Sequence, residues 1–204
     1  MKSQNAFTVN AEPGNASNNN LMIARESNRK FVIENCTTSD ADSILALYDA
    51  ATSLQTQKNS VVWPTFEKTF IEKEISEGRQ WKLMADGEIA CNWAITFNDN
   101  EIWAERDKND SIYIHRIATS PSHRGNRFID EIVDWARTYA RSKGRQYVRL
   151  DTLGNNTRLI QHYTSAGFKF LGIFRLHNTQ GLPNHYQREP NCCLFEMPIN
   201  EKIN

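Results

Sequence analysis

The sequence predicts a mixed α/β (α+β) domain, in which one central sheet carries helices on both of its faces. Short apolar strand candidates and amphipathic helix candidates follow one another in the order β α α β β β α β α β β. Mixed strands and helices in this order favour a layered fold over a helical bundle or a barrel. A chain of 204 residues is long enough for one sizeable core, so we expect a single domain.

The composition argues against several classes of partner. Lysine and arginine (24 together) balance aspartate and glutamate (24 together), so no excess charge indicates nucleic acid or an anionic membrane. No run of about eighteen apolar residues could span a membrane, and the first residues lack the apolar core of a secretory signal. Four cysteines fit no metal-ligand spacing. We therefore expect a reduced, cytoplasmic protein without a metal.

Residues 1–29 are expected to form a disordered or vector-derived tail, followed by one domain over residues 30–204. The segment 15–20 is polar and of low complexity, and it offers no periodic apolar face that a core could bury. Met22 is an alternative natural start.

A strand and two helices are expected to open the domain. Phe31–Cys36 alternates apolar and polar residues, as a half-buried strand does. Residues 39–42 are a capping stretch before a helix with apolar positions Ile44, Leu45, Leu47 and Tyr48. Pro64 then opens a second helix, Thr65–Glu77, because proline is favoured at the first helical position.

A hairpin and a charged insertion are expected next. Asp86-Gly87 is a strong two-residue turn signal between strands Gln80–Ala85 and Glu88–Phe97. Residues 101–110 surround Trp103 with acidic residues, and two interpretations stay open. The segment is either a solvated loop with one anchoring tryptophan, or it binds a cationic amine through the Trp103 ring and Glu105.

The stretch 112–168 organises the rest of the chain. A strand, Ile112–Thr119, runs through a tight basic turn into a helix that begins near Asn126 and has one apolar face. After Gly144 come a strand, Gln146–Asp151, and a short helix capped by Asn155 or Asn156. Two further strands, Lys169–Leu176 and Cys192–Ile199, close the domain around a loop at 178–191.

The basic turn is a candidate phosphate site. The first backbone N–H groups of a helix have no partner within the helix, and the helix dipole places partial positive charge there. Arg124 and Arg127 add two guanidinium charges, and Gly125 adds a permissive backbone. An ordinary turn with solvated arginines explains the same pattern equally well.

Two segments resemble the signatures of the GCN5-related N-acetyltransferases. Residues 124–129, Arg-Gly-Asn-Arg-Phe-Ile, lie where that family carries Gln/Arg-x-x-Gly-x-Gly/Ala, its pyrophosphate loop. Asn156, Tyr163 and Gly167-Phe168 resemble its second signature, Asn…Tyr-x-x-x-Gly-Phe. The first segment departs from the family, because Arg127 and Ile129 stand where glycine or alanine is usual.

The resemblance implies a splayed sheet, acetyl-CoA as the acyl donor and a set of residues that bind it. The pyrophosphate would meet the turn, and the pantetheine arm would run along the preceding strand. The implied cofactor residues are Ile117, Ala118, Thr119, Arg124, Gly125, Asn126, Arg127, Phe128, Ile129 and Asn156.

Acetyl transfer to an amine needs a base near neutrality and benefits from an acid for the thiolate. His115 lies on the strand before the turn, with Ile117 and Thr119 expected on its face, and some relatives place a catalytic histidine at the corresponding strand position. Tyr163 matches the family's general acid position. Either side chain could instead be a packed structural residue.

The sequence therefore predicts an acetyl-CoA-dependent N-acetyltransferase acting on a primary amine of a small molecule, as a monomer or homodimer. Trp63 is a further candidate for lining the acceptor pocket, and core packing is its alternative role. Two other functions stay open: acetylation of protein N-termini or lysines, and a degenerate acyl-CoA-binding module without turnover.

Overall fold

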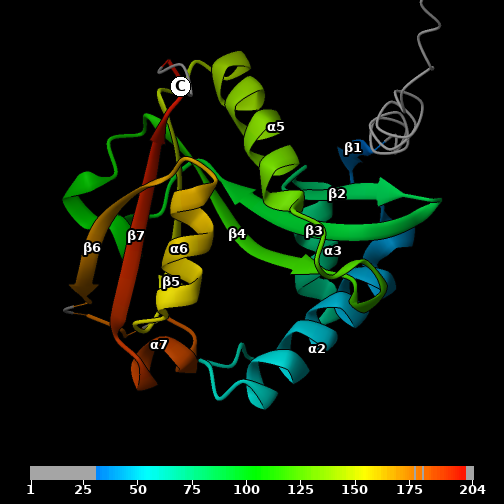
Figure 1. Cartoon of the computed structure of the whole chain (residues 1–204), viewed down its shortest axis with the longest axis horizontal. Coiled ribbons are helices and arrows are strands. Elements are labelled where there is room, and N and C mark those ends of the chain that lie inside the picture. The colour runs from blue at the N-terminus through cyan, green and yellow to red at the C-terminus, as the bar shows by residue number, and fades with distance from the viewer. Residues whose placement is uncertain (1–30, 177, 181, 201–204) are drawn as a thin grey trace, which may run out of the picture. The chain divides into compact units, whose positions relative to one another are not determined.

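The computed structural model describes residues 31–200 except 177 and 181, so the prediction for the tail lies outside the described residues. The described part contains one seven-stranded mixed sheet of order β1-β2-β3-β4-β5-β7-β6 (Figure 1). Its strands are β1 Val32–Asn35, β2 Gln80–Ala85, β3 Glu88–Thr96, β4 Ser111–Thr119, β5 Tyr147–Leu153, β6 Lys169–Arg175 and β7 Asn191–Pro198.

The sheet opens between its two central strands. β4 and β5 pair in parallel from Ser111 to Ile114 and from Tyr147 to Leu150, and their pairing ends there. β4 continues to Thr119 because it stays paired with its antiparallel neighbour β3. β5 continues to Leu153 because it stays paired with its antiparallel neighbour β7. Beyond Ile114 the two strands diverge, as Figure 1 shows. The predicted α/β class and the splayed sheet are therefore confirmed.

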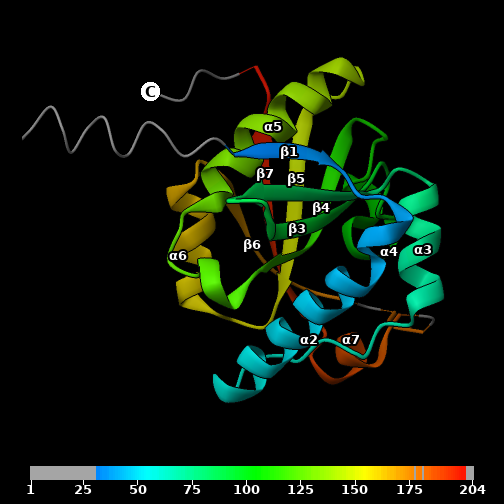
Figure 2. The same ribbon diagram turned by 90° about the vertical axis from the view of Figure 1, so that its right-hand side faces the viewer.

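Helices cover both faces of the sheet (Figure 2). On one face, α5 (Phe128–Ser142) and α6 (Thr157–Ser165) pack against the main core. The buried side chains of α5 are spaced as the sequence predicts: Phe128, Ile129, Ile132, Val133, Ala136 and Ala140. On the other face lie α2 (Ala41–Gln57) and α3 (Lys68–Ser76) with their own apolar cluster. Within the described residues, no helix is both long and apolar enough to cross a bilayer.

Three predicted segments differ from the structure. The helix expected at Thr65–Glu77 begins only at Lys68, because Glu67 is still extended and Trp63 donates its N–H to Gln55 Oε1 at 2.9 Å. The insertion at 101–110 forms α4 (Asn100–Trp103) and a 3₁₀ turn, Ala104–Arg106. The loop at 178–191 contains a short helix, α7 (Asn184–Arg188).

A small third core explains why the insertion folds. Ile102 and Trp103 are buried in a cluster with Tyr113 of β4 and with Leu182, Cys192 and Leu194. Ile102 and Trp103, in a charged stretch, thus gain apolar burial that depends in large part on the distant C-terminal segment. Sequence periodicity cannot reveal such a partner, so the segment reads locally as a loop.

Candidate functional site

A cavity of about 590 Å³ opens where β4 and β5 part. One side is formed by Ile114–Thr119 of β4, and the other by Leu150–Leu153 of β5 together with residues of α6. The cavity continues past the C-terminal half of α2 and the segment at 58–66 to α4 and α7. Most of the predicted site residues line it: Trp63, His115, Ile117, Ala118, Thr119, Arg124, Asn156 and Tyr163.

The turn before α5 has the features of a phosphate site. Gly125 has a φ of +92°, which favours glycine, and no atom of the described residues lies within 4 Å of the position that a Cβ would occupy. Asn126 donates from Nδ2 to the carbonyl of His123 at 2.8 Å and fixes the turn. Phe128 and Ile129 are buried in the main core, so only their backbone can meet a ligand.

The two arginines of the turn differ in surroundings. Arg124 is exposed, lines the cavity and reaches the carbonyl of Ala50 in α2 at 3.3 Å. Arg127 instead forms an ion pair with Asp130, at 2.7 Å between Nε and Oδ2. Its guanidinium already has a carboxylate partner, so Arg124 is the better placed of the two to meet a phosphate.

α6 positions the second signature. The side-chain oxygen of Asn156 accepts the N–H groups of Arg158 and Leu159 at 3.1 and 3.2 Å, so Asn156 is the helix cap. Two turns further, Tyr163 packs on Phe195 and Phe168, with ring centroids 5.3 and 6.1 Å apart. Burial, with Cys91 and Asp151 nearby, raises the pKa of Tyr163 above its ordinary value, so the phenol keeps its proton at neutral pH.

His115 lies on β4 at the start of the divergence. A bulge follows it: Asn92 pairs with Ala118 but Ala94 pairs with His115, and Arg116 has a φ of +52°. The bulge breaks the expected alternation, so His115 does not share a face with Ile117 and Thr119, contrary to the sequence prediction. The His115 Nε2 and the Thr96 hydroxyl are 2.9 Å apart.

The surroundings of His115 lower its pKa to about 3, first through burial and then through the positive charges of Arg116 and Arg79. The imidazole is therefore neutral at physiological pH. A ring with so low a pKa is protonated only in strong acid, so His115 does not have the near-neutral pKa that the predicted role of base requires.

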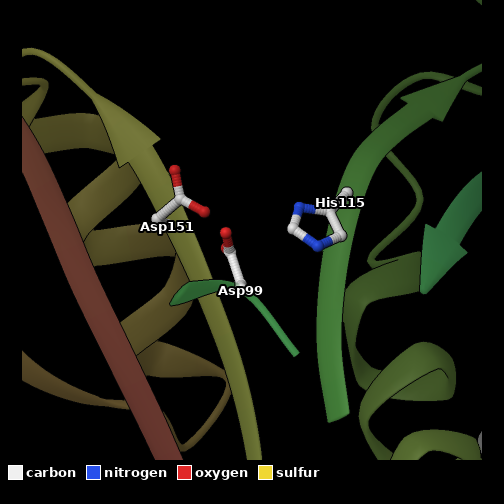
Figure 3. A group of neighbouring side chains, drawn as sticks. All are labelled: Asp99, His115 and Asp151. Atoms are coloured by element: carbon white, nitrogen blue, oxygen red, sulfur yellow. The ribbon is translucent and has the colours of Figure 1, made fainter. Parts of the chain in front are cut away.

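Two aspartates that the sequence analysis did not select complete the site. Asp99 comes from the turn between β3 and α4, and Asp151 from the end of β5. Figure 3 shows both side chains facing His115 across the gap between the strands. A ring nitrogen of His115 and one oxygen of each carboxylate lie within 4.8 Å of one another.

The two carboxyl groups titrate in an unusual range. Burial raises the pKa of Asp151 to about 7, and burial together with the charge of Asp151 raises the pKa of Asp99 to about 8. Two carboxylates this close resist ionising together, so they titrate as a pair and exchange a proton near neutrality. The sequence contained a signal for Asp151, because a charged residue is unusual in an apolar strand. Asp151 directly follows Leu150, where the pairing of β5 with β4 ends.

One imidazole and two carboxylates at this spacing also form a donor set that suits a divalent cation. The sequence predicted no metal, and a chelator control is therefore included in the activity test below.

The three residues predicted to bind the acceptor differ in whether they line the cavity. Trp63 lines the cavity and packs on Tyr48, with centroids 5.8 Å apart. Trp103 is buried between Tyr113 and the guanidinium of Arg149, which lies 4.9 Å from its ring. Glu105 is exposed on the 3₁₀ turn, while Glu101 lines the cavity. The structure therefore brings Trp63 to the site but not Trp103 or Glu105.

Comparisons with known proteins agree with this geometry. Residues 48–168 match the model of the acetyltransferase (GNAT) family. The uncharacterized N-acetyltransferase YesJ of Bacillus subtilis (strain 168) is 25% identical over 146 residues, which cover 65% of this chain and 78% of YesJ.

Solved structures show the same fold. A GNAT-family acetyltransferase from Listeria monocytogenes 4b F2365 superposes with a TM-score of 0.65 at 20% identity, covering 82% of this chain and 94% of that one. yncA of Salmonella typhimurium, solved with its cofactor acetyl-CoA, has a TM-score of 0.58 at 14% identity and covers 85% and 96%. Because the family model spans more than half of the sequence, the chain belongs to the GNAT family of N-acetyltransferases.

Proposed function

We propose that the protein transfers the acetyl group of acetyl-CoA to the primary amine of a small molecule. The observation that carries this proposal is the carboxylate pair Asp99 and Asp151, which lies beside a neutral His115 in the gap of the sheet. A cationic amine is attracted to such a pair, and the pair can take up its proton near neutral pH.

The residues present fit acetyl-CoA. β4 has no β5 partner beyond Ile114, so the backbone edge at Ile117–Thr119 is free to pair with the amides of pantetheine, as an added strand would. The N-terminus of α5 and Arg124 lie where that strand ends and suit the pyrophosphate. The bound donor supplies an acetyl thioester, whose sulfur departs as a thiolate.

The proton transfers follow from the positions of the side chains. Asp99 and Asp151 hold the ammonium and accept its proton, which leaves a neutral nitrogen to attack the thioester carbonyl carbon. As the carbon–sulfur bond breaks, the Tyr163 hydroxyl gives its proton to the sulfur. The attacking nitrogen, which is cationic after addition, releases its second proton to solvent as the amide forms, and solvent reprotonates Tyr163. His115 keeps its ring neutral and forms one wall beside the nitrogen.

A thiol-release screen tests the function. Purified protein is incubated with acetyl-CoA and panels of alkylamines, arylalkylamines, polyamines, amino acids and aminoglycosides, with and without a chelator. We expect turnover with small amines and no effect of the chelator. Turnover only with peptides or proteins would support the alternative acceptor, and binding of acetyl-CoA without any turnover would indicate a non-catalytic module.

Substitution of the turn arginines tests the placement of the cofactor. Arg124→Ala is expected to weaken coenzyme A binding by about 1–3 kcal/mol, because a charge-assisted hydrogen bond to phosphate is lost. Arg127→Ala should cost less, since Asp130 already pairs with that guanidinium. Titration calorimetry with coenzyme A measures both. An unchanged affinity in Arg124→Ala would show that the pyrophosphate lies elsewhere.

A further inference from the structure

One wall of the cavity carries a guanidinium among aromatic rings. Arg116 follows His115 directly, and its φ of +52° is unusual for a residue with a side chain. The bulge turns Arg116 to the same side of the sheet as His115, where it contacts α2 and α3. Its guanidinium carbon lies 5.3 Å from the ring centroid of Phe70 and 5.6 Å from that of Phe66.

At this wall the partly buried positive charges outnumber the buried negative charges. Glu74 is buried, with 1% exposure, and its carboxylate is shared by two guanidinium groups: Arg116 at 2.6 Å and Arg79 at 2.7 Å. The second carboxylate partner of Arg79 is Glu77, whose side chain is 41% exposed and therefore solvated. One buried carboxylate thus serves two cations. The lowered pKa of His115, to which both arginines contribute, reflects the same positive field.

Arg116 keeps hydrogen-bonding capacity for a ligand. Its Nη2 donates to both oxygens of Glu74, and its Nε lies 3.4 Å from the Tyr48 hydroxyl. Within the described part of the chain, Nη1 has no hydrogen-bond partner, and Arg116 lines the cavity. The Nη1 group can therefore donate a charge-assisted hydrogen bond to a carboxylate.

We propose that the acceptor is an amino acid, bound with its ammonium at Asp99 and Asp151 and its carboxylate at Arg116. The inference rests on the proposed function and narrows its substrate class. The lining of the cavity carries both the carboxylate pair and, directly after His115 in the chain, the guanidinium of Arg116, so it complements a zwitterion better than a simple amine. Trp63, Phe66 and Phe70 also line the cavity, which favours an apolar or aromatic side chain on the acceptor.

The test compares three acceptors that differ only in the group that Arg116 would meet: phenylalanine, phenylalaninamide and phenethylamine. For the wild-type enzyme we expect kcat/KM to be roughly 10- to 100-fold higher for the acid than for the other two, the range of a hydrogen bond to a charged group. The amide also mimics a peptide N-terminus, so it separates a free amino acid from a protein acceptor.

Arg116→Gln should abolish the preference for the acid, measured within that variant as the ratio of kcat/KM for phenylalanine to kcat/KM for phenethylamine. Arg79→Gln is the matched control, because it also removes one guanidinium from Glu74 but does not line the cavity. That variant should keep the preference. If Arg116→Gln does not fold, Arg116→Lys takes its place and should retain part of the preference, because it keeps the positive charge.

The outcomes distinguish this inference from the function on which it rests. Equal kcat/KM for acid, amide and amine in the wild type, or a preference for the amide, would overturn the inference and leave the acetyltransferase function standing. A preference that survives Arg116→Gln, or that is lost equally in Arg79→Gln, would make Arg116 a structural clamp of the bulge. Lack of turnover with every amine would instead refute the proposed function.

Discussion

Tyr163→Phe is expected to lower kcat by about 10²–10⁴-fold, because it removes the proton donor for the departing thiolate. The phenylalanine ring preserves the contacts with Phe195 and Phe168 and so leaves the core intact. Stopped assays of thiol release at saturating acetyl-CoA and amine measure the loss. Burial raises the pKa of Tyr163, so the wild-type enzyme should show no loss of activity from ionisation of the phenol below pH 10.

Unchanged melting temperature and unchanged affinity for coenzyme A are the controls for this variant. They show that the variant folds and binds the donor. Phe195→Leu, which alters the packing of the same ring without touching its hydroxyl, should affect stability more than kcat. Full turnover by Tyr163→Phe would assign protonation of the sulfur to solvent water.

Asp151→Asn is expected to lower kcat/KM by about 10²–10⁴-fold and to change its dependence on pH. In the wild type, kcat/KM should rise with pH around 7, since the pair must lose a proton before it can accept one from the ammonium. In the variant this rise should shift to lower pH, because Asp99 then titrates without the charge of Asp151. His115→Gln should keep the rise around pH 7, because the pKa of His115 is about 3 and the ring does not titrate in this range.

The stability of Asp151→Asn provides its control. The pKa of Asp151 is higher in the folded protein, at about 7, than in an unfolded chain, at about 3.9. The folded state therefore binds more protons between these values, and the wild type loses stability as pH rises through this window. Asparagine has no such dependence. Denaturant unfolding at pH 8 should find the variant at least as stable as the wild type, so a large destabilisation would contradict the raised pKa.

Several parts of the site could be predicted from the sequence because they depend on neighbours along the chain. The apolar face of α5 follows from residues spaced at the 3.6-residue helical period. The turn at Gly125 needs a positive φ, which glycine adopts easily. The cap at Asn156 forms because its side-chain oxygen accepts the first free N–H groups of α6. Tyr163, which also lines the cavity, was indicated by the resemblance to the second family signature. Local chemistry fixes where such residues stand relative to their own helix or strand.

Tertiary structure alone decided how the acceptor side is built. Asp99 lies in the turn after β3 and Asp151 lies in β5, and only the tertiary fold brings them together beside His115 where β4 and β5 diverge. The bulge at Arg116 reverses the face on which the following residues lie, which strict alternation cannot predict. Burial lowers the pKa of His115 and raises that of Asp151, and it turned Trp103 from a pocket candidate into core. Burial and long-range charge depend on which distant segments meet, and that information is spread over the whole chain.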